Sequence, residues 1–178
     1  MIKKTEKSPY LGGEVGMRIR EIRQTKGKTI EELANEAYVT KGTLSRFEKG
    51  WSPTSLNYAL FLRNEYGISF DWIYEGETIL KAHKSRGSKQ DILDPMAIGA
   101  RLKGLRESLG LNRVEFSKLT GMSNSVICQY EKGERTPRVE TAMKIKQATQ
   151  KPLDWIYFGD EIIVPKSVRR AEKLKKTG

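Results

Sequence analysis

Apolar residues along the chain recur every three or four positions, which is the spacing of one face of an α-helix. The first such run begins at Met17 and ends at Gly27, and shorter runs follow up to Gly76. No stretch of useful length alternates apolar and polar residues, so we expect no strands. The pattern predicts an all-α protein.

Helix-start signals mark where the shorter helices begin. Thr29 and Glu32 have the hydroxyl–carboxylate spacing of a capping box, and Asn112-x-x-Glu115 repeats it later in the chain. Thr40 is suited to cap the helix that follows, and Gly50 is suited to end it. These signals predict compact units built from several short helices.

The chain contains an internal repeat. A shift of 83 positions aligns residues 16–76 with residues 99–159 without a gap; Glu-Lys-Gly recurs at 48–50 and 131–133, and Asp-Trp-Ile-Tyr-x-Gly ends both copies. A long period that occurs twice indicates two copies of one small domain. The aromatic endings are interpreted as closure of each core. We therefore expect an N-terminal arm at 1–15, a first domain at 16–76, a flexible linker at 77–98, a second domain at 99–159 and a basic tail at 160–178.

Charge adds a candidate partner to this organisation. The 178 residues include 33 Lys+Arg and 22 Asp+Glu, which gives a formal net charge of +11. Such an excess favours a polyanion or a membrane surface as partner. The first domain is nearly neutral, with nine basic and eight acidic residues, whereas the second has 11 basic and six acidic residues. We expect the second domain to dominate nonspecific attraction to a polyanion.

Residue usage excludes several classes of function. Cys128 is the single cysteine and His83 the single histidine, which excludes an intramolecular disulfide framework and leaves little room for a metal cluster or a catalytic triad. We expect no catalytic residues, no metal and no cofactor, and an enzyme is the least favoured class. No apolar run approaches the ~18 residues of a membrane span and no secretory signal appears, so we expect a cytoplasmic protein.

In each copy the second and third predicted helices are short and about three residues apart, which is the helix-turn-helix spacing. On these residues the sequence resembles the Cro / lambda-repressor-like (XRE) family. The resemblance implies two tandem five-helix domains that bind double-stranded DNA, with recognition helices at about 40–49 and 123–132 in major grooves. It rests on Arg23…Gly27…Leu33-Ala34…Val39-Thr40…Leu44-Ser-Arg-Phe-Glu-Lys-Gly50 and on Arg106…Gly110-Leu-Asn…Phe116…Gly121-Met-Ser…Ile127…Tyr130-Glu-Lys-Gly-Glu-Arg-Thr-Pro-Arg138.

The resemblance also implies a role for individual residues. Base reading falls to the start and exposed face of each recognition helix, at Lys41, Gly42, Thr43 and Arg46, and at Asn124, Ser125, Val126 and Gln129. Phosphate contacts fall to helix N-termini and nearby cations, at Thr29, Thr40, Lys49 and Ser55, and at Arg113, Ser123, Lys132, Arg135 and Arg138. Structural ion pairs are expected at Arg23–Glu48 and Arg106–Glu131. For either helix the alternative is a solvated polar face.

The first copy departs from the family pattern. The usual turn glycine, present as Gly121, is replaced by Tyr38; the usual glutamine at the second residue of helix two is Ile30 here and Arg113 in the second copy; and Trp51-Ser-Pro-Thr replaces the basic loop. One alternative has the second domain bind DNA while the first is a protein-interaction or dimerisation module, as in an antiactivator or antitoxin-like regulator. It is motivated by the near-zero charge of the first domain and by three candidates for exposed apolar residues, Tyr38, Trp51 and Tyr58. RNA binding is a third interpretation, disfavoured because an aromatic stacking platform is missing.

The main expectation is a sequence-specific transcriptional regulator, a repressor, that binds a double-stranded DNA operator in the nucleoid. A homodimer or a regulatory protein partner remains open, and no small-molecule ligand or membrane is expected. The linker has a root-mean-square reach of ~25 Å, and adjacent half-sites lie ~34 Å apart. On this estimate one chain can occupy two successive major grooves.

Overall fold

The computed structural model describes residues 12–78 and 90–161. The predicted arm up to residue 11, the linker residues 79–89 with His83, and the tail from residue 162 lie outside the described residues. The described residues form ten α-helices and no strand, which confirms the all-α prediction. None of these helices has the length and hydropathy that a membrane span requires.

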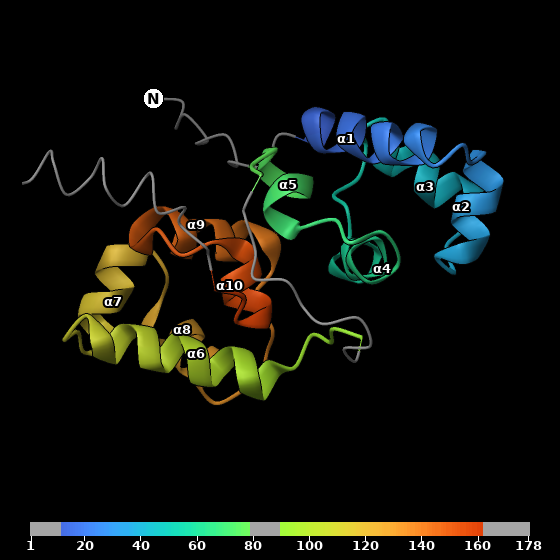
Figure 1. Cartoon of the computed structure of the whole chain (residues 1–178). Coiled ribbons are helices and arrows are strands. Elements are labelled where there is room, and N and C mark those ends of the chain that lie inside the picture. The colour runs from blue at the N-terminus through green and yellow to red at the C-terminus, as the bar shows by residue number, and fades with distance from the viewer. Residues whose placement is uncertain (1–11, 79–89, 162–178) are drawn as a thin grey trace, which may run out of the picture.

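Each repeat folds into five helices, as predicted (Figure 1). The first domain contains α1 (Gly12–Thr25), α2 (Ile30–Glu36), α3 (Lys41–Glu48), α4 (Leu56–Tyr66) and α5 (Phe70–Glu75). The second contains α6 (Pro95–Ser108), α7 (Arg113–Thr120), α8 (Asn124–Glu131), α9 (Val139–Thr149) and α10 (Leu153–Phe158).

Both predicted capping boxes are confirmed. The Thr29 hydroxyl accepts a hydrogen bond from Glu32 N (3.2 Å), and the Glu32 carboxylate accepts one from Thr29 N (2.7 Å). Asn112 exchanges the same pair of bonds with Glu115. Because these bonds satisfy N–H groups that have no partner within the helix, they fix where α2 and α7 begin.

The first helix of each domain begins four residues before the expected domain boundary, at Gly12 rather than 16 and at Pro95 rather than 99. The reason is apolar burial in the added turn, since Val15 and Ile98 are both fully buried. At α6 the start is also fixed by Asp94, whose carboxylate accepts hydrogen bonds from two backbone N–H groups of the first turn.

A glycine lets the first helix of each domain lie directly against the third. A Cβ added at Gly16 would lie 2.6 Å from the backbone oxygen of Phe47, and one at Gly99 would lie 2.2 Å from that of Tyr130. Both distances are far below van der Waals contact. The close crossings of α1 over α3 and α6 over α8 therefore set the positions of α3 and α8, the two predicted recognition helices.

Candidate nucleic-acid interface

The recognition helix of the first domain, α3, is held by its apolar face. Leu44 and Phe47 are buried in the core, so Lys41, Gly42 and Arg46 are exposed and Thr43 is half-buried. Lys41 Nζ lies 3.1 Å from Glu31 on α2, in a pair that is two-thirds exposed. An ion pair this exposed is weak and screened, so it leaves Lys41 available to a phosphate or a base.

The recognition helix of the second domain, α8, has the same construction with a different surface. Ile127 and Tyr130 are buried, and the predicted base-reading residues face outward. Gln129 accepts a hydrogen bond from Arg135 (3.3 Å), which ties the side chain to the loop after the helix. Asn124 and Ser125 are exposed, and Val126 and Gln129 are half-buried.

Two predicted phosphate contacts cap the recognition helices. The Thr40 hydroxyl accepts a hydrogen bond from Thr43 N (3.1 Å), and the Ser123 hydroxyl accepts one from Val126 N (3.3 Å). Both hydroxyls remain exposed at helix N-termini, where free N–H groups and the helix dipole favour an anion. Thr29 occupies the same kind of position at α2, within its capping box.

The two expected ion pairs join the first helix of each domain to the end of its recognition helix. Arg23 Nε lies 2.6 Å from Glu48 Oε1 and Arg23 Nη2 lies 2.9 Å from Glu48 Oε2. Arg106 forms the equivalent pair with Glu131, at 2.5 and 3.3 Å. Each guanidinium also donates to a backbone oxygen of the loop after the first helix. These contacts join α1 to the end of α3 and α6 to the end of α8, and so help to fix the orientation of α3 and α8.

Arg113, a predicted phosphate contact, also binds Glu131, with Arg113 Nε 2.8 Å from Glu131 Oε2. Burial opposes ionisation of Glu131, but the hydrogen bonds from Arg106 and Arg113 outweigh it, so the pKa of this carboxyl is lowered. Arg113 is still exposed. Arg113 therefore pairs with the last residue of α8 while its own side chain remains exposed at the N-terminus of α7.

Two further predicted phosphate contacts come together from different domains. Ser55 caps α4 and Arg138 is the N-cap residue of α9. They lie at equivalent positions of the repeat and line one cleft of about 340 Å³ between the two helix N-termini, together with Pro53, Leu56 and Val139. Linear sequence gave no reason to place these residues side by side.

The remaining predicted phosphate contacts follow the recognition helices. Lys49 Nζ lies 4.5 Å from the ring centroid of Trp51, whose side chain is 73% exposed. Lys132 Nζ lies 3.7 Å from Glu134 in the equivalent loop of the second domain. Tyr38, at the turn before α3, is 97% exposed with φ +52°, a left-handed conformation that Gly121 adopts without strain in the second domain.

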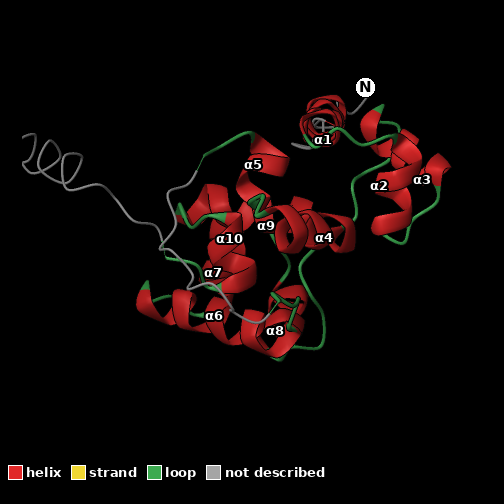
Figure 2. Cartoon of the chain, turned by 45° about the vertical axis from the view of Figure 1, so that its right-hand side comes forward, coloured by secondary structure: helices red, strands yellow, loops and turns green. Residues whose placement is uncertain are grey.

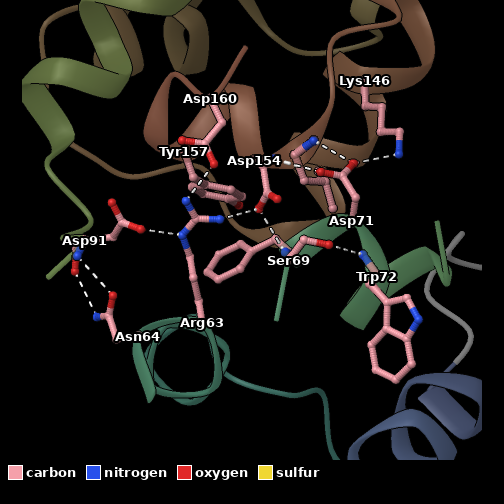
Figure 3. A network of polar contacts seen from close by, with 12 residues as sticks. Arg63, Asn64, Ser69, Asp71, Trp72, Asp91, Lys146, Asp154, Tyr157 and Asp160 are labelled. Carbon is pink, nitrogen blue, oxygen red and sulfur yellow. Dashed lines mark hydrogen bonds and ion pairs between the residues drawn. The ribbon is translucent and has the colours of Figure 1, made fainter. Parts of the chain in front are cut away.

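Sequence reasoning missed a buried polar contact between the domains, although it identified the motif that makes it. Asp71 on α5 accepts hydrogen bonds from the backbone N–H groups of Leu153 (2.9 Å) and Asp154 (2.8 Å). Asp154 on α10 accepts one from Phe70 N (2.8 Å) in return. Each aspartate thus binds the N-terminal turn of the other domain's last helix (Figure 3). The core-closure interpretation of the aromatic endings agrees with the burial of Tyr74 and Tyr157, whereas the two aspartates beside them serve the contact between the domains.

Two cations extend this contact from the fourth helices. Arg63 on α4 lies 3.1 Å from Asp154 and 2.7 Å from both Asp160 and Asp91, and its guanidinium stacks 4.0 Å from the ring of Phe158. Arg63 is only 6% exposed although it is charged, and its carboxylate partners compensate for that burial.

Lys146 on α9 occupies the equivalent position and lies 2.8 Å from Asp71, with Glu75 and Glu77 also bound. Burial alone would lower its pKa, but the hydrogen bonds to the three carboxylates outweigh that effect and raise the pKa above its ordinary value. These three acidic residues surround an ammonium group that already neutralises part of their charge.

One signal in the sequence pointed to this contact. Asp71 and Asp154 are identical in the two copies, within otherwise apolar and aromatic endings, and position 63/146 is basic in both. A carboxylate retained in an apolar segment requires a buried partner. That partner was not identifiable from one copy alone, because it belongs to the other domain.

The contact sets how the recognition helices are placed relative to each other. A half-turn in the plane of Figure 1 carries α1, α4 and α5 approximately onto α6, α9 and α10. In that view α1 and α6 pass in front of α3 and α8. In the turned view of Figure 2, α3 lies to the right of α1 and α8 to the right of α6, as expected for helices at the back of Figure 1. Both recognition helices therefore lie toward one side of the molecule.

Comparison with known proteins supports the interpretation of each domain. A family model described as helix-turn-helix matches residues 19–73 and again residues 102–156. This double match confirms the resemblance to the Cro / lambda-repressor-like type and the tandem arrangement. No curated protein and no solved structure gives a significant match to the chain.

Proposed function

The chain belongs to the helix-turn-helix family through both of its domains, and on that basis we propose that it is a sequence-specific transcriptional repressor that inserts α3 and α8 into major grooves of one DNA site. The family is a DNA-binding, non-enzymatic one. We place the protein in the cytoplasm, on the nucleoid, and repression follows from occupying DNA that a promoter needs.

One observation carries this proposal. Both recognition helices lie toward the same side of the molecule, and each presents exposed polar side chains that suit base edges. Lys41 and Arg46 suit the O6 and N7 acceptors of guanine, whereas Asn124 and Gln129 suit the N6 and N7 groups of adenine. Phosphate contacts from the helix N-termini and nearby cations would orient the chain on the duplex.

The alternative makes the first domain a protein-interaction module. Tyr38 and Trp51 are strongly exposed, which fits a protein partner. Tyr58 was expected to be exposed as well, but its ring is buried in the core, in contact with Phe47 and Phe61. However, the family model matches the first domain over the same length as the second, so the match does not favour this division of roles. DNA-binding measurements on variants of α3 and α8 distinguish a first domain that reads DNA from one that binds a protein.

Binding sites would first be selected from random duplex DNA with the full chain, and affinities measured for two double variants. Lys41→Ala with Arg46→Ala tests α3, and Asn124→Ala with Gln129→Ala tests α8. We expect each lost base contact to weaken binding by about 1–3 kcal/mol and to relax sequence preference in one half of the site only.

Arg20→Ala with Lys103→Ala provides the matched control. These exposed cations occupy equivalent positions on α1 and α6, and their loss removes the same charge as the α3 variant. The control should keep its sequence preference. If only the α8 variant loses specificity, the first domain does not read DNA; if neither does, α3 and α8 are not recognition helices.

A further inference from the structure

The contacts between the domains are reciprocal. A residue in the first domain and its equivalent, 83 positions later, exchange roles across the interface: Phe70 N donates to Asp154, and Leu153 N donates to Asp71. An interface in which the same patch on each unit contacts the other is isologous, and it implies a two-fold axis.

The cations follow the same rule. Arg63 binds Asp154 and Asp160, and Lys146, its equivalent, binds Asp71 and Glu77, which occupy the equivalent positions. Three independent pairs of contacts thus repeat with the domains exchanged. The two domains are joined as the subunits of a symmetric dimer are, although they belong to one chain.

The interface between the domains is also buried and closely packed. Asp71 and Asp154 are almost fully buried, and Phe70 packs with ring centroids 5.2 Å from Tyr157 and 4.9 Å from Phe158. Separating the domains would leave buried carboxylates and helix N–H groups without these partners until water replaced them. The contact therefore restricts the independent placement of the domains that the linker length alone would permit.

We propose that the chain acts as a single-chain pseudo-dimer, and that its DNA ligand is an inverted pair of two different half-sites at one fixed separation. This inference rests on the proposed function. The two-fold relation makes the half-sites inverted, because a dyad that relates the recognition helices must also relate the DNA segments they contact. The half-sites differ because Lys41, Thr43 and Arg46 on α3 correspond to Asn124, Val126 and Gln129 on α8.

The chain thereby recognises a DNA site whose two halves differ. A homodimer of identical units would instead be matched to a site with two identical halves. The surface that would join two such units is already filled by the second domain of the same chain. A second copy is not needed to complete the interface or the pair of recognition helices.

The test changes the geometry of the DNA and leaves the wild-type chain intact. The starting duplex is the best selected site. One duplex has a half-site reversed to give a direct repeat, and two others have two or five base pairs inserted at the centre. We expect each change to weaken binding at least tenfold, because one half-site is then out of reach or faces away.

The interface variant Asp71→Asn with Asp154→Asn supplies the second arm. It should bind the inserted duplexes nearly as well as the original one, because weakening the interface lets the two domains change their relative placement. Circular dichroism would establish that its helices are retained. Should the wild-type chain bind direct and inverted sites equally, or tolerate both insertions, the pseudo-dimer is wrong. Failure to select any preferred sequence would instead refute the proposed function itself, and the inference with it.

Discussion

Replacing Asp71 with alanine tests how strongly the two domains are joined. The carboxylate is fully buried and accepts hydrogen bonds from two backbone N–H groups at the start of α10, while it also pairs with Lys146. Alanine removes all three interactions at once. It also leaves two buried N–H groups without an acceptor at a helix N-terminus.

The structure sets the size of the effect. A hydrogen bond to a charged group contributes about 1.5–3 kcal/mol, and breaking a buried ion pair costs about 3–5 kcal/mol. Lys146 keeps two other carboxylates, which reduces the loss from the ion pair. We therefore expect Asp71→Ala to lower the free energy of unfolding by about 3–4 kcal/mol. With a urea m value of about 2 kcal/mol/M, the midpoint falls by about 1.5–2 M.

Glu77→Ala is the matched control for this measurement. Glu77 binds the same lysine, but its side chain is 55% exposed, so its loss should cost less than about 1 kcal/mol. Urea unfolding followed by circular dichroism compares the two variants with the wild type. Equal shifts for both variants would show that burial of the carboxylate does not set the free energy lost with it, because burial is the property in which Asp71 and Glu77 differ.

Three further predictions concern the individual domains. Gly99→Ala should destabilise the protein by about 1–3 kcal/mol because the added Cβ meets the backbone of α8. Gly104→Ala, on the same helix but with open space around the added Cβ, should stabilise the protein by about 1 kcal/mol. Thermal melts that rank the two variants in the opposite order would contradict the close crossing of α6 over α8. Tyr38→Gly should not lower the melting temperature, because relief of about 1 kcal/mol of left-handed strain offsets the backbone entropy that glycine adds to the unfolded chain. A clear fall in the melting temperature would show that no such strain is stored there. The pKa of Glu131 is lowered in the folded state, so its ionisation stabilises the fold at any pH above its unfolded pKa, near 4.5. This contribution is lost as the pH falls through the lower folded value, and the stability difference between wild type and Glu131→Gln should therefore shrink in acid. Urea melts that give the same difference at every pH would contradict this expectation.

The sequence was sufficient for the parts of the fold that depend on local signals. Capping boxes at Thr29 and Asn112 and the apolar periodicity predicted the helices, and the repeat predicted two similar domains. Helix starts were less accurate because an extra turn is added where an apolar residue, such as Val15 or Ile98, reaches the core. At α1 that burial depends on tertiary packing, which the local sequence does not signal. At α6 a helix-start signal was present, because Asp94 is the N-cap residue and Pro95 follows it at the first helical position.

The arrangement of the domains was not predictable in the same way. The length and composition of the linker suggested free movement, but the energy that opposes it comes from Arg63, Asp71, Lys146 and Asp154, whose partners lie about 70–100 positions away. Comparing the two copies reveals that these positions keep their charge. It does not reveal that each copy's charges are satisfied by the other copy.

The most direct test of the account is the mass of the complex between the full chain and its selected duplex. Light scattering at saturating protein, with a duplex just long enough for both half-sites, gives the number of chains bound. We predict one chain per duplex, since a single chain already carries both recognition helices and the interface that relates them. Two chains on that duplex, one for each half-site, would show that the single chain is not a pseudo-dimer.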